Sequence, residues 1–435
     1  MSESIDIGIV GGGAAGLMAA IAAGRAAPDA RVVVLDGAER IGAKILIAGG
    51  GRCNVTHREV DALDFHGSSR NAIAKVLRSL PISETIEFFR GIGVELKEEE
   101  TGKLFPTSDR AKTVLDALLE ACSNAGAEVR TGARVIAIEP RANEFVLRLG
   151  SGEEIIASRV VLATGGRSVP KTGSDGAGYE LVRRFGHSIV PTFPALVPLM
   201  LPAGHWLTDL RGASCNAEVR VRSESGKVYA AVTGSILMTH FGLSGPAILD
   251  ISRHLAAARE HDASAGIEIS FFPSPPEAEA AAPESSRAVA RVGGATFDDV
   301  LGWIRDQAID NPHAAIRNLF HGAVPEKVGE AIIREGAGLD PSEPFGRLRR
   351  EAQRSLAQSG TALRVPISRD RGWDFAEVTA GGVPLSEIHL ATMESRIVSR
   401  LHLCGEIWDV DGRIGGFNFQ WAWASGKLAG EGAAR

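Results

Sequence analysis

The sequence predicts an α/β fold that begins with a mononucleotide-binding β-α-β unit, and three features of its first 36 residues carry this prediction. Residues 4–10 (SIDIGIV) form an apolar run typical of a buried strand. A glycine-rich loop and an Ala-rich helix extending to about Ala27 follow. Residues 31–35 (RVVVL) indicate a second strand ending at Asp36, so the segment has the length that a β-α-β unit requires.

The next segment predicts a loop near a ligand and then further elements of the same fold. Residues 40–57 are Gly-rich and irregular, which suits a loop close to a bound molecule. Helices are expected over 70–90 and 110–125, and short strands over 128–160. Residues 159–163 (RVVLA) indicate another buried strand.

The character of the sequence changes near Pro191. Short strand-like segments extend from there to about residue 272, and residues 273–294 are rich in Pro, Ala, Glu and Ser, which favours a surface loop. A helical pattern covers residues 297–358. One face of its first helix carries Phe297, Val300, Leu301 and Ile304.

Strand signals return near the C-terminus, at 361–368, 373–383 and 400–404, and a closing helix is expected to begin near Gln420. The pattern therefore divides the chain into a discontinuous first domain with two inserted domains. The segments are the first part of the first domain (1–190), a β-rich domain (191–295), a helical domain (296–360) and the second part of the first domain (361–435).

Composition places the chain among globular proteins. Its 435 residues are 44% hydrophobic and 23% charged, and the formal net charge of −6 indicates neither a nucleic-acid partner nor an anionic membrane surface. The uncharged run from Ile7 to Gly24 contains six glycines and follows the acids Glu3 and Asp6. We therefore expect a strand, loop and helix there, and no membrane span.

The cysteines indicate a reducing compartment. The four cysteines form no CxxC pair and no metal-type spacing, so we expect no metal site and small buried apolar residues at Cys53, Cys122, Cys215 and Cys404. We expect a cytoplasmic protein that is a monomer or a weak dimer.

The glycine loop has the spacing of a dinucleotide fingerprint, Gly11-x-Gly13-x-x-Gly16, between a strand and a helix. The first glycine permits the tight turn, the second lets a pyrophosphate approach the backbone, and the third packs the helix on the strand. Asp36 lies 20 residues after Gly16, where its carboxylate can accept hydrogen bonds from ribose hydroxyls. The predicted contacts are Gly11, Gly13, Ala14, Ala15, Gly16, Asp36 and Gly37.

Two further signatures favour FAD over NAD as the resident dinucleotide. Ala163-Thr164-Gly165-Gly166 resembles a signature of two-domain flavoproteins. Cys404-Gly405-Glu406-x-x-Asp409 resembles their closing signature, in which an acid and a following helix N-terminus meet the ribityl chain and pyrophosphate. A pure NAD dehydrogenase needs neither. We therefore expect non-covalent FAD contacting Thr164, Gly165, Gly166, Glu406 and Asp409.

The segment Lys44–Thr56 (KILIAGGGRCNVT) closely resembles the signature of the BaiN/RdsA-like (YhiN-like, aminoacetone oxidase) family of FAD-dependent oxidoreductases. The similarity extends over nearly the whole chain. Further matching segments are 162–178, Gly186-His187, 238–247, 378–383, 392–395 and 404–426. The resemblance implies an FAD domain like that of glutathione reductase, divided between the chain ends, with a β-rich and a helical domain between.

The chain departs from the family pattern at five positions. Asp36 stands where Glu is usual, Ala48 replaces Ser, His57 replaces Asn, and Val169 and Phe417 each replace Tyr. The shorter acid can still reach ribose. A mechanism that uses a Ser hydroxyl at position 48, or a Tyr hydroxyl at 169 or 417, for proton transfer is therefore not expected here.

The loop beside the expected flavin carries the first group of candidate residues. Gly51, Arg52, Cys53 and Asn54 are predicted to contact pyrophosphate, flavin or substrate, together with Lys44. Lys44 is also a catalytic candidate, because a cation near flavin N1 and C2=O would stabilise the negative charge of the reduced cofactor. We expect no redox role for the cysteine.

Other candidates lie outside this loop. Arg134 and Val135 begin a strand expected to pass the adenine. The backbone of Gly415-Gly416-Phe417-Asn418 is expected to face the flavin pyrimidine ring. His240, within THFGLSGP, is a candidate general acid, with a structural role in a turn as the alternative. The basic run around Arg349 is expected to be a solvated helix face, because acids flank it.

These features predict an FAD-dependent oxidoreductase that transfers a hydride to or from flavin N5. The favoured version is a reductase that uses NADH or NADPH to reduce an activated double bond of a small molecule bound beside the inserted domain. One alternative is an oxidase of a small amine, and another is a binding protein with structural FAD. Only one dinucleotide fingerprint is present, so no dedicated NAD(P)H domain is expected.

Overall fold

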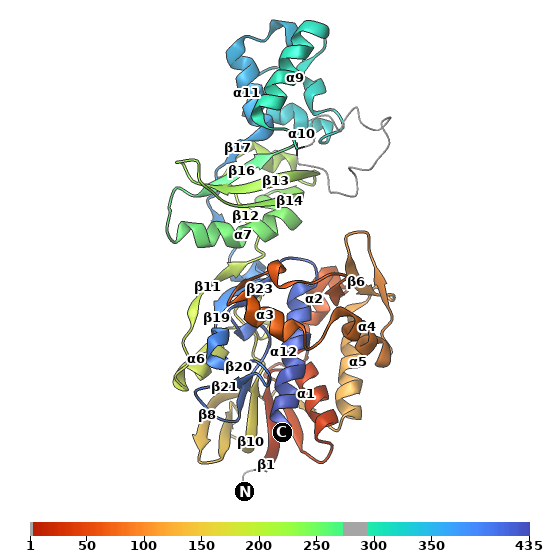
Figure 1. Ribbon diagram of the computed structural model, residues 1–435, viewed down its shortest axis with the longest axis vertical. Coiled ribbons are helices and arrows are strands. Elements are labelled where there is room, and N and C mark those ends of the chain that lie inside the picture. The colour runs from red at the N-terminus through yellow and green to blue at the C-terminus, as the bar shows by residue number, and fades with distance from the viewer. Residues whose placement is uncertain (1–2, 273–293) are drawn as a thin grey trace. The chain divides into compact units, whose positions relative to one another are not determined.

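The computed structural model describes residues 3–272 and 294–435. The chain forms two compact units, which are shown in Figure 1. Unit 1 comprises the chain up to Pro194 and from Trp373 to Arg435, and unit 2 comprises Ala195–Gly372. Each unit has a separate hydrophobic core.

Unit 1 is built on a nine-stranded sheet whose central strands run parallel in the order β22-β10-β1-β2-β7. Because β10 and β22 flank the first β-α-β unit, the two ends of the chain share one sheet. The strands are β1 (Glu3–Val10), β2 (Val32–Leu35), β7 (Glu128–Arg130), β8 (Val135–Arg141), β9 (Glu144–Leu149), β10 (Glu154–Leu162), β20 (Ile388–His389), β21 (Glu394–Ser395) and β22 (Leu401–Leu403).

Seven helices belong to the described part of unit 1, and the first and last of them pack closely together. They are α1 (Ala14–Ala26), α2 (Ala43–Gly51), α3 (Arg70–Leu77), α4 (Ile82–Gly91), α5 (Ala111–Asn124), α6 (Ala177–Arg184) and α12 (Phe417–Ala433). A Cβ atom on Gly426 would lie 2.5 Å from Ala15 O, and one on Gly430 would lie 2.2 Å from Ala19 O. These glycines of α12 therefore allow its backbone to approach α1.

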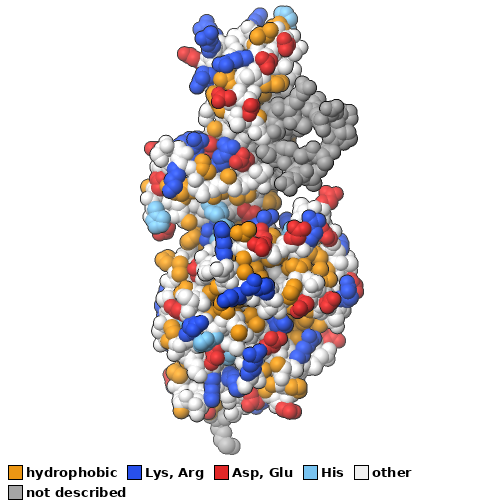
Figure 2. Space-filling model, viewed as in Figure 1, with side chains coloured by type: hydrophobic (Ala, Val, Ile, Leu, Met, Phe, Trp, Pro, Cys, Tyr) orange, Lys and Arg blue, Asp and Glu red, His pale blue; other side chains and the backbone are white. Residues whose placement is uncertain are grey.

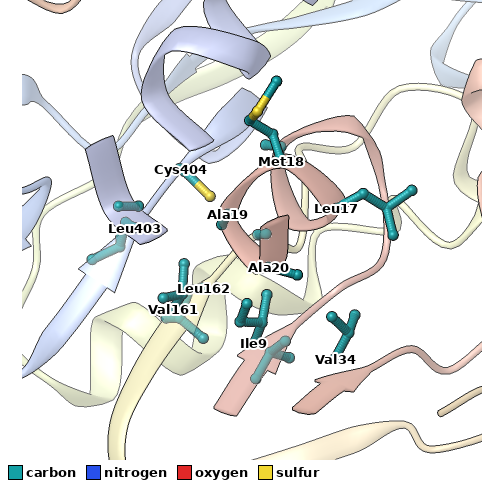
Figure 3. Packing of buried hydrophobic residues seen from close by; sticks show 14 of the residues in the cluster. Ile9, Leu17, Met18, Ala19, Ala20, Val34, Val161, Leu162, Leu403 and Cys404 are labelled. Atoms are coloured by element: carbon teal, nitrogen blue, oxygen red, sulfur yellow. The ribbon is translucent and has the colours of Figure 1, made fainter. Parts of the chain in front are cut away.

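Figure 3 shows the core between α1 and the sheet. Ile9 of β1, Val34 of β2 and Leu403 of β22 are fully buried, as is Leu17 of α1. Burial of each such side chain contributes about 1.5–3 kcal/mol to stability. The run Ile7–Gly24 thus forms a buried strand end, a loop and most of a helix. Among residues 3–272 and 294–435, every helix is too short or too polar to cross a lipid bilayer.

Smaller sheets surround this core. They pair β3 (Thr56–His57), β6 (Lys103–Pro106) and β5 (Leu96–Glu98); β23 (Val410–Gly412) and β4 (Phe65–Gly67); and β11 (Val190–Ala195) and β19 (Val378–Gly382). The last pair joins the segment that leaves unit 1 to the segment that returns to it.

Unit 2 contains a seven-stranded, mainly antiparallel sheet in the order β17-β16-β13-β14-β15-β12-β18. The strands are β12 (Leu199–Met200), β13 (Ser214–Arg222), β14 (Val228–Thr239), β15 (Gly242–Ser244), β16 (Gly266–Ser270), β17 (Leu363–Val365) and β18 (Arg369–Asp370). The helices are α7 (Pro246–Arg259), α9 (Phe297–Asp310), α10 (Glu326–Ala331) and α11 (Arg350–Thr361). Strand and helix residues share one core, in which Phe272 stacks on Phe320 at 5.4 Å between ring centroids.

Three local expectations differ from the structure: those for residues 246–259, for residues 40–57 and for the start of the closing helix. Residues 246–259 form α7, where the sequence predicted only short strands, because Ile248, Ile251 and Leu255 recur at helical spacing and are buried. The expected loop at 40–57 contains α2, which is interrupted at Ala48, Gly49 and Gly50 by non-helical backbone.

The closing helix begins at Phe417, because Gly416 with φ 96° caps it three residues before the expected start. The surface loop expected at 273–294 lies, except for its last residue, outside the described residues.

Candidate functional site

The glycine loop of unit 1 follows β1 and leads into α1. Gly11 has φ 104°, and a Cβ atom there would lie 2.4 Å from Ala163 O, so the turn requires glycine. A Cβ atom on Gly16 would lie 1.9 Å from Gly11 O, which shows how closely the helix packs on the loop. A Cβ atom on Gly13 would meet nothing within 4 Å. The backbone at Gly13, the N-cap of α1, is therefore open to a ligand.

Asp36 closes this loop from the end of β2. Its Oδ2 accepts a hydrogen bond from Gly12 N at 2.6 Å, and its Oδ1 accepts one from Ala38 N at 2.8 Å. Each carboxylate oxygen has a second lone pair that can accept a further hydrogen bond. Asp36 therefore fixes the loop and keeps acceptors for a diol such as that of ribose.

Replacement of Asp36 by alanine is expected to weaken FAD binding at least tenfold, because charge-assisted hydrogen bonds contribute roughly 1.5–3 kcal/mol each. Titration of the apoprotein with FAD, followed by flavin fluorescence, measures the affinity. Asp36→Glu, which restores the usual acid, is the matched control and should bind FAD within a few-fold of the parent. Unchanged affinity in the alanine variant would show that the carboxylate does not contribute to binding.

The predicted adenine-side residues lie next to Asp36. Ala133 N donates to Asp36 O at 2.7 Å, and a Cβ atom on Gly37 would lie 2.9 Å from Arg134 Cβ. The Arg134 guanidinium forms an ion pair with Asp175 at 2.5 Å. Val135 is buried at the start of β8. The start of β8 thus lies beside the end of β2.

A polar cluster lies where segments from three parts of unit 1 meet. We name it the Lys44 cluster; it comprises Lys44, Ser168, Ser174, Thr379 and Glu406. Lys44 Nζ donates to Glu406 Oε2 and to Ser168 Oγ, both at 2.6 Å. Ser168 Oγ donates to Glu406 Oε1 at 2.6 Å, and Thr379 N donates to the same oxygen at 2.9 Å. The side chains of Lys44 and Glu406 are 28% and 20% exposed, so the cation remains accessible from one side.

The turn after β10 packs against this cluster. A Cβ atom on Gly166 would lie 2.3 Å from Thr379 Oγ1 and 2.9 Å from Glu406 Oε1, and one on Gly165 would lie 2.7 Å from Ser174 Oγ. The structure thus brings together the predicted residues Lys44, Gly165, Gly166 and Glu406. No sequence pattern singles out Ser168, Ser174 or Thr379, although all three lie within the segments 162–178 and 378–383.

Arg52 is directed toward acidic side chains of its own unit. Its guanidinium donates to Glu99 at 2.5 Å, lies 3.6 Å from Asp109, and sits 4.0 Å above the ring of Phe105. The hydrogen bond to Glu99 raises the pKa of the guanidinium. Among the candidate cations of this loop, Lys44 is therefore the one held in the cluster with Glu406.

Gly51 and Cys53 shape the end of α2. Gly51 has φ 87° and Cys53 has φ 62°, so both adopt left-handed backbone. The Cys53 side chain is fully buried, and burial raises the pKa of its thiol to about 12. A thiol with this pKa is protonated at neutral pH and is a poor nucleophile.

Four buried polar atoms of unit 1 have no hydrogen-bond partner in the described structure. They are Asn54 Oδ1, Thr164 Oγ1, Tyr179 Oη and Trp408 Nε1. An unpaired buried polar atom costs about 1–3 kcal/mol, and native structures contain few. Burial, and then the charge of Glu406, raises the pKa of the Tyr179 hydroxyl. All four lie in or near the segments that predict FAD contacts, so the residues present fit a polar ligand such as FAD.

The C-terminal candidates lie in a tightly packed turn before α12. Asp409 is 9% exposed, and Ser68 N donates to its carbonyl oxygen at 2.8 Å. The buried Phe417 ring stacks on His57 at 4.9 Å. The Asn418 amide bonds to both N and O of Gly412 at 2.8 Å. The two side chains at 417 and 418 therefore hold the turn, and contact between its backbone and the flavin stays a prediction.

His240 belongs to unit 2. It is exposed at the turn between β14 and β15, where its ring lies edge-to-face with the Phe241 ring at 5.1 Å between centroids. Its role as a general acid stays a prediction. The remaining cysteines, Cys122, Cys215 and Cys404, are buried free thiols, and burial raises the pKa of each.

Comparison with known proteins agrees with this geometry. The family described as HI0933-like protein Rossmann domain matches residues 5–432. A 3-dehydro-bile acid delta(4,6)-reductase of Clostridium scindens is 35% identical over 98% of both chains. A ribosomal RNA dihydrouridine synthase of Escherichia coli is 30% identical over 97% of this chain and 96% of that protein.

A solved structure extends the likeness to the fold. A flavocytochrome c3 fumarate reductase in an open conformation is 16% identical, with a TM-score of 0.50 over 100% of this chain and 78% of that chain. The predicted α/β fold with a Rossmann-type FAD-binding domain is confirmed, as is the predicted family. The chain belongs to the HI0933-like Rossmann family of FAD-dependent oxidoreductases.

Proposed function

We propose that this oxidoreductase binds FAD non-covalently in unit 1 and transfers a hydride from NADH or NADPH to an activated double bond of a small molecule. The main support for the cofactor assignment is the set of four unpaired buried polar atoms, which lie in or near the segments that predict FAD contacts. FAD offers donors and acceptors along its whole length. A cofactor bound there would satisfy groups that the protein itself leaves without partners.

The direction of the reaction is inferred from two relatives. One is named a delta(4,6)-reductase and the other a dihydrouridine synthase, and dihydrouridine carries two more hydrogens than uridine. Both names denote the addition of hydrogen to a substrate. They favour a reductase over an oxidase for this chain as well.

Specific residues would supply the polar environment of the reaction. FAD, when bound, accepts and donates hydride at N5 of its ring system. Lys44 holds a positive charge near the expected ring. Glu406 and Ser168 fix its position through bonds of 2.6 Å. The open backbone at Gly13 and the carboxylate of Asp36 would hold the pyrophosphate and the adenosine ribose.

The purified protein is expected to be yellow, with FAD and not FMN bound without a covalent bond. This expectation rests on the fingerprint from Gly11 to Gly16 and on Asp36, which together can bind an adenosine ribose. FMN lacks that ribose. Heat-denatured extract analysed by HPLC identifies the released flavin. FMN in the extract, or flavin that stays with the precipitate, would contradict the assignment of non-covalent FAD.

The electron donor is expected to bind weakly and to leave before the acceptor enters. Only one dinucleotide fingerprint is present, so NAD(P)H must use the substrate cavity itself. Anaerobic stopped-flow absorbance should show reduction of the bound flavin with weak saturation by NADH or NADPH, and steady-state rates should follow ping-pong kinetics. A tight ternary complex of enzyme, NAD(P)H and acceptor would contradict this. Reduction by amines and not by NAD(P)H would instead support an oxidase.

A further inference from the structure

Unit 2 carries a charged pocket that the proposed function does not use. The pocket has a volume of about 420 Å³, and its lining includes Arg220, Arg222, Glu268, Phe297, Gln358 and Arg364. Figure 2 shows basic and acidic side chains gathered over β13 and β16. We call this site the arginine pocket.

Side chains of three neighbouring strands point alternately to the two faces of the sheet, and one of these faces forms the floor of the arginine pocket. Alternate residues such as Val219, Ile269 and Val365 are buried in the unit 2 core. Residues of the opposite face carry charge. In the pairing register Arg220 of β13 lies opposite Glu268 of β16, and Glu268 lies opposite Arg364 of β17. Neighbouring strands are about 4.8 Å apart, so positive, negative and positive side chains form one row.

The charges of this row do not cancel. Glu268 is 2% exposed and accepts hydrogen bonds from Arg222 Nη1 at 3.0 Å and from Arg220 Nη1 at 3.5 Å. Arg220 also pairs with Glu218 at 2.7 Å. Together, Arg220, Arg222, Arg364, Glu218 and Glu268 bring three guanidinium groups and two carboxylates, which leaves one net positive charge. A buried carboxylate fixes the arginines in place, since an unpaired charge would be costly there.

Two of the arginines have donors to spare. Arg222 uses Nε on Gly226 O and Nη1 on Glu268, and within residues 3–272 and 294–435 its Nη2 has no acceptor. Arg364 donates only through Nη2, to Ser223 O at 3.2 Å, within the same residues. Neither its Nε nor its Nη1 has an acceptor in the described part of the chain, and the side chain is exposed. Planar guanidinium donors of this kind bind phosphate oxygens in pairs.

The pocket is larger than a phosphate group requires. Its lining adds the aromatic ring of Phe297, on which the Arg354 guanidinium lies at 5.3 Å, and the amide of Gln358. Aromatic rings and amides are the groups that stack on and hydrogen-bond to nucleobases. We propose that the arginine pocket binds a nucleotide, with Arg222 and Arg364 holding the phosphate and Phe297 and Gln358 contacting the base.

Isothermal titration of the full FAD-loaded protein with UMP tests this proposal, with uridine and a short oligouridylate as further ligands. UMP is expected to bind, uridine is expected to bind at least about tenfold more weakly, and binding should weaken as salt rises. Arg364→Gln is the first variant. Among the described residues this exposed side chain donates a hydrogen bond only to Ser223 O, so its loss should leave the fold intact. It should weaken UMP binding at least about tenfold.

Arg222→Gln is the second variant and should have the same effect, with circular dichroism and flavin content checked because Glu268 loses a partner. Arg211→Gln, at an exposed position of unit 2 outside the pocket, is the matched control and should bind UMP normally. Tighter binding of oligouridylate than of UMP would identify a polynucleotide chain as the source of the nucleotide, and equal binding would identify a free nucleotide. Equal affinity for uridine and UMP, or UMP binding that Arg364→Gln does not change, would overturn the proposal.

Discussion

Replacement of Lys44 by methionine is expected to lower kcat by about 10²- to 10³-fold while FAD stays bound, because one preorganised electrostatic contact in a water-poor site contributes this much. Lys44 Nζ is fixed at 2.6 Å from both Glu406 Oε2 and Ser168 Oγ and remains 28% exposed. Methionine keeps the length of the stem and removes the charge. Steady-state kinetics with the flavin content measured in the same sample gives the result per bound cofactor.

Two controls separate a catalytic Lys44 from one that only holds the fold. Lys112→Met removes an exposed lysine of α5 that pairs only with Asp116 one turn away, and should leave kcat unchanged. Lys44→Arg keeps the charge and should retain part of the activity. The reduction potential of the bound flavin should fall in Lys44→Met alone. Lys44→Met could instead keep a kcat within threefold of the parent and have a lower melting temperature. That result would show that Lys44 stabilises the fold and is not catalytic.

The sequence could identify Lys44 and Glu406 separately, because each lies in a local signature. It could not pair them, since 362 residues separate them. The pairing follows from topology: β2, β1, β10 and β22 are parallel neighbours, so the segments that follow β2, β10 and β22 meet at the same edge of the sheet. Those segments carry Lys44, Gly165 and Glu406. Ser168 and Thr379 have no distinguishing pattern of their own. Their importance comes only from the position that this sheet gives them.

A sequence motif also does not identify the partner of a long side chain. Arg52 is predicted to contact pyrophosphate, flavin or substrate, and in the structure its guanidinium donates a hydrogen bond to Glu99, 47 residues later. The motif indicates that Arg52 lies close to the site. It cannot show which acceptors of the folded protein lie within reach of the guanidinium.

In the inserted region, the sequence pattern does not show which helices and strands pack together. The sequence predicted a β-rich domain and a helical domain, because strand and helix patterns follow one another along the chain. The described residues from Ala195 to Gly372 form one compact unit. Strand residues such as Ile269 and helix residues such as Leu301 belong to the same hydrophobic core. Periodicity indicates which face of an element is apolar, but not which element covers that face.

Removal of unit 2 is expected to abolish turnover and leave FAD binding largely in place. The change replaces residues 196–372 by a short Gly-Ser linker. Every signature that predicts FAD contact, and the whole Lys44 cluster, lies in unit 1. The strands at the junction, β11 and β19, already pair with one another, so a short connection can join them. Because the cores of the two units share no residue, the remaining core should fold.

The expected loss of turnover has a separate cause. The candidate general acid His240 belongs to unit 2, and general acid catalysis contributes roughly 10²- to 10⁴-fold to a rate. Flavin content by absorbance, far-UV circular dichroism and anaerobic reduction by dithionite measure the folded FAD-bound fraction, and acceptor reduction measures turnover. His240→Gln in the full chain is the matched variant, and it should retain FAD and lose activity within the same range. A folded unit 1 that binds no FAD would show that unit 2 builds part of the cofactor site. Undiminished turnover without unit 2 would show that unit 2 has no role in the reaction.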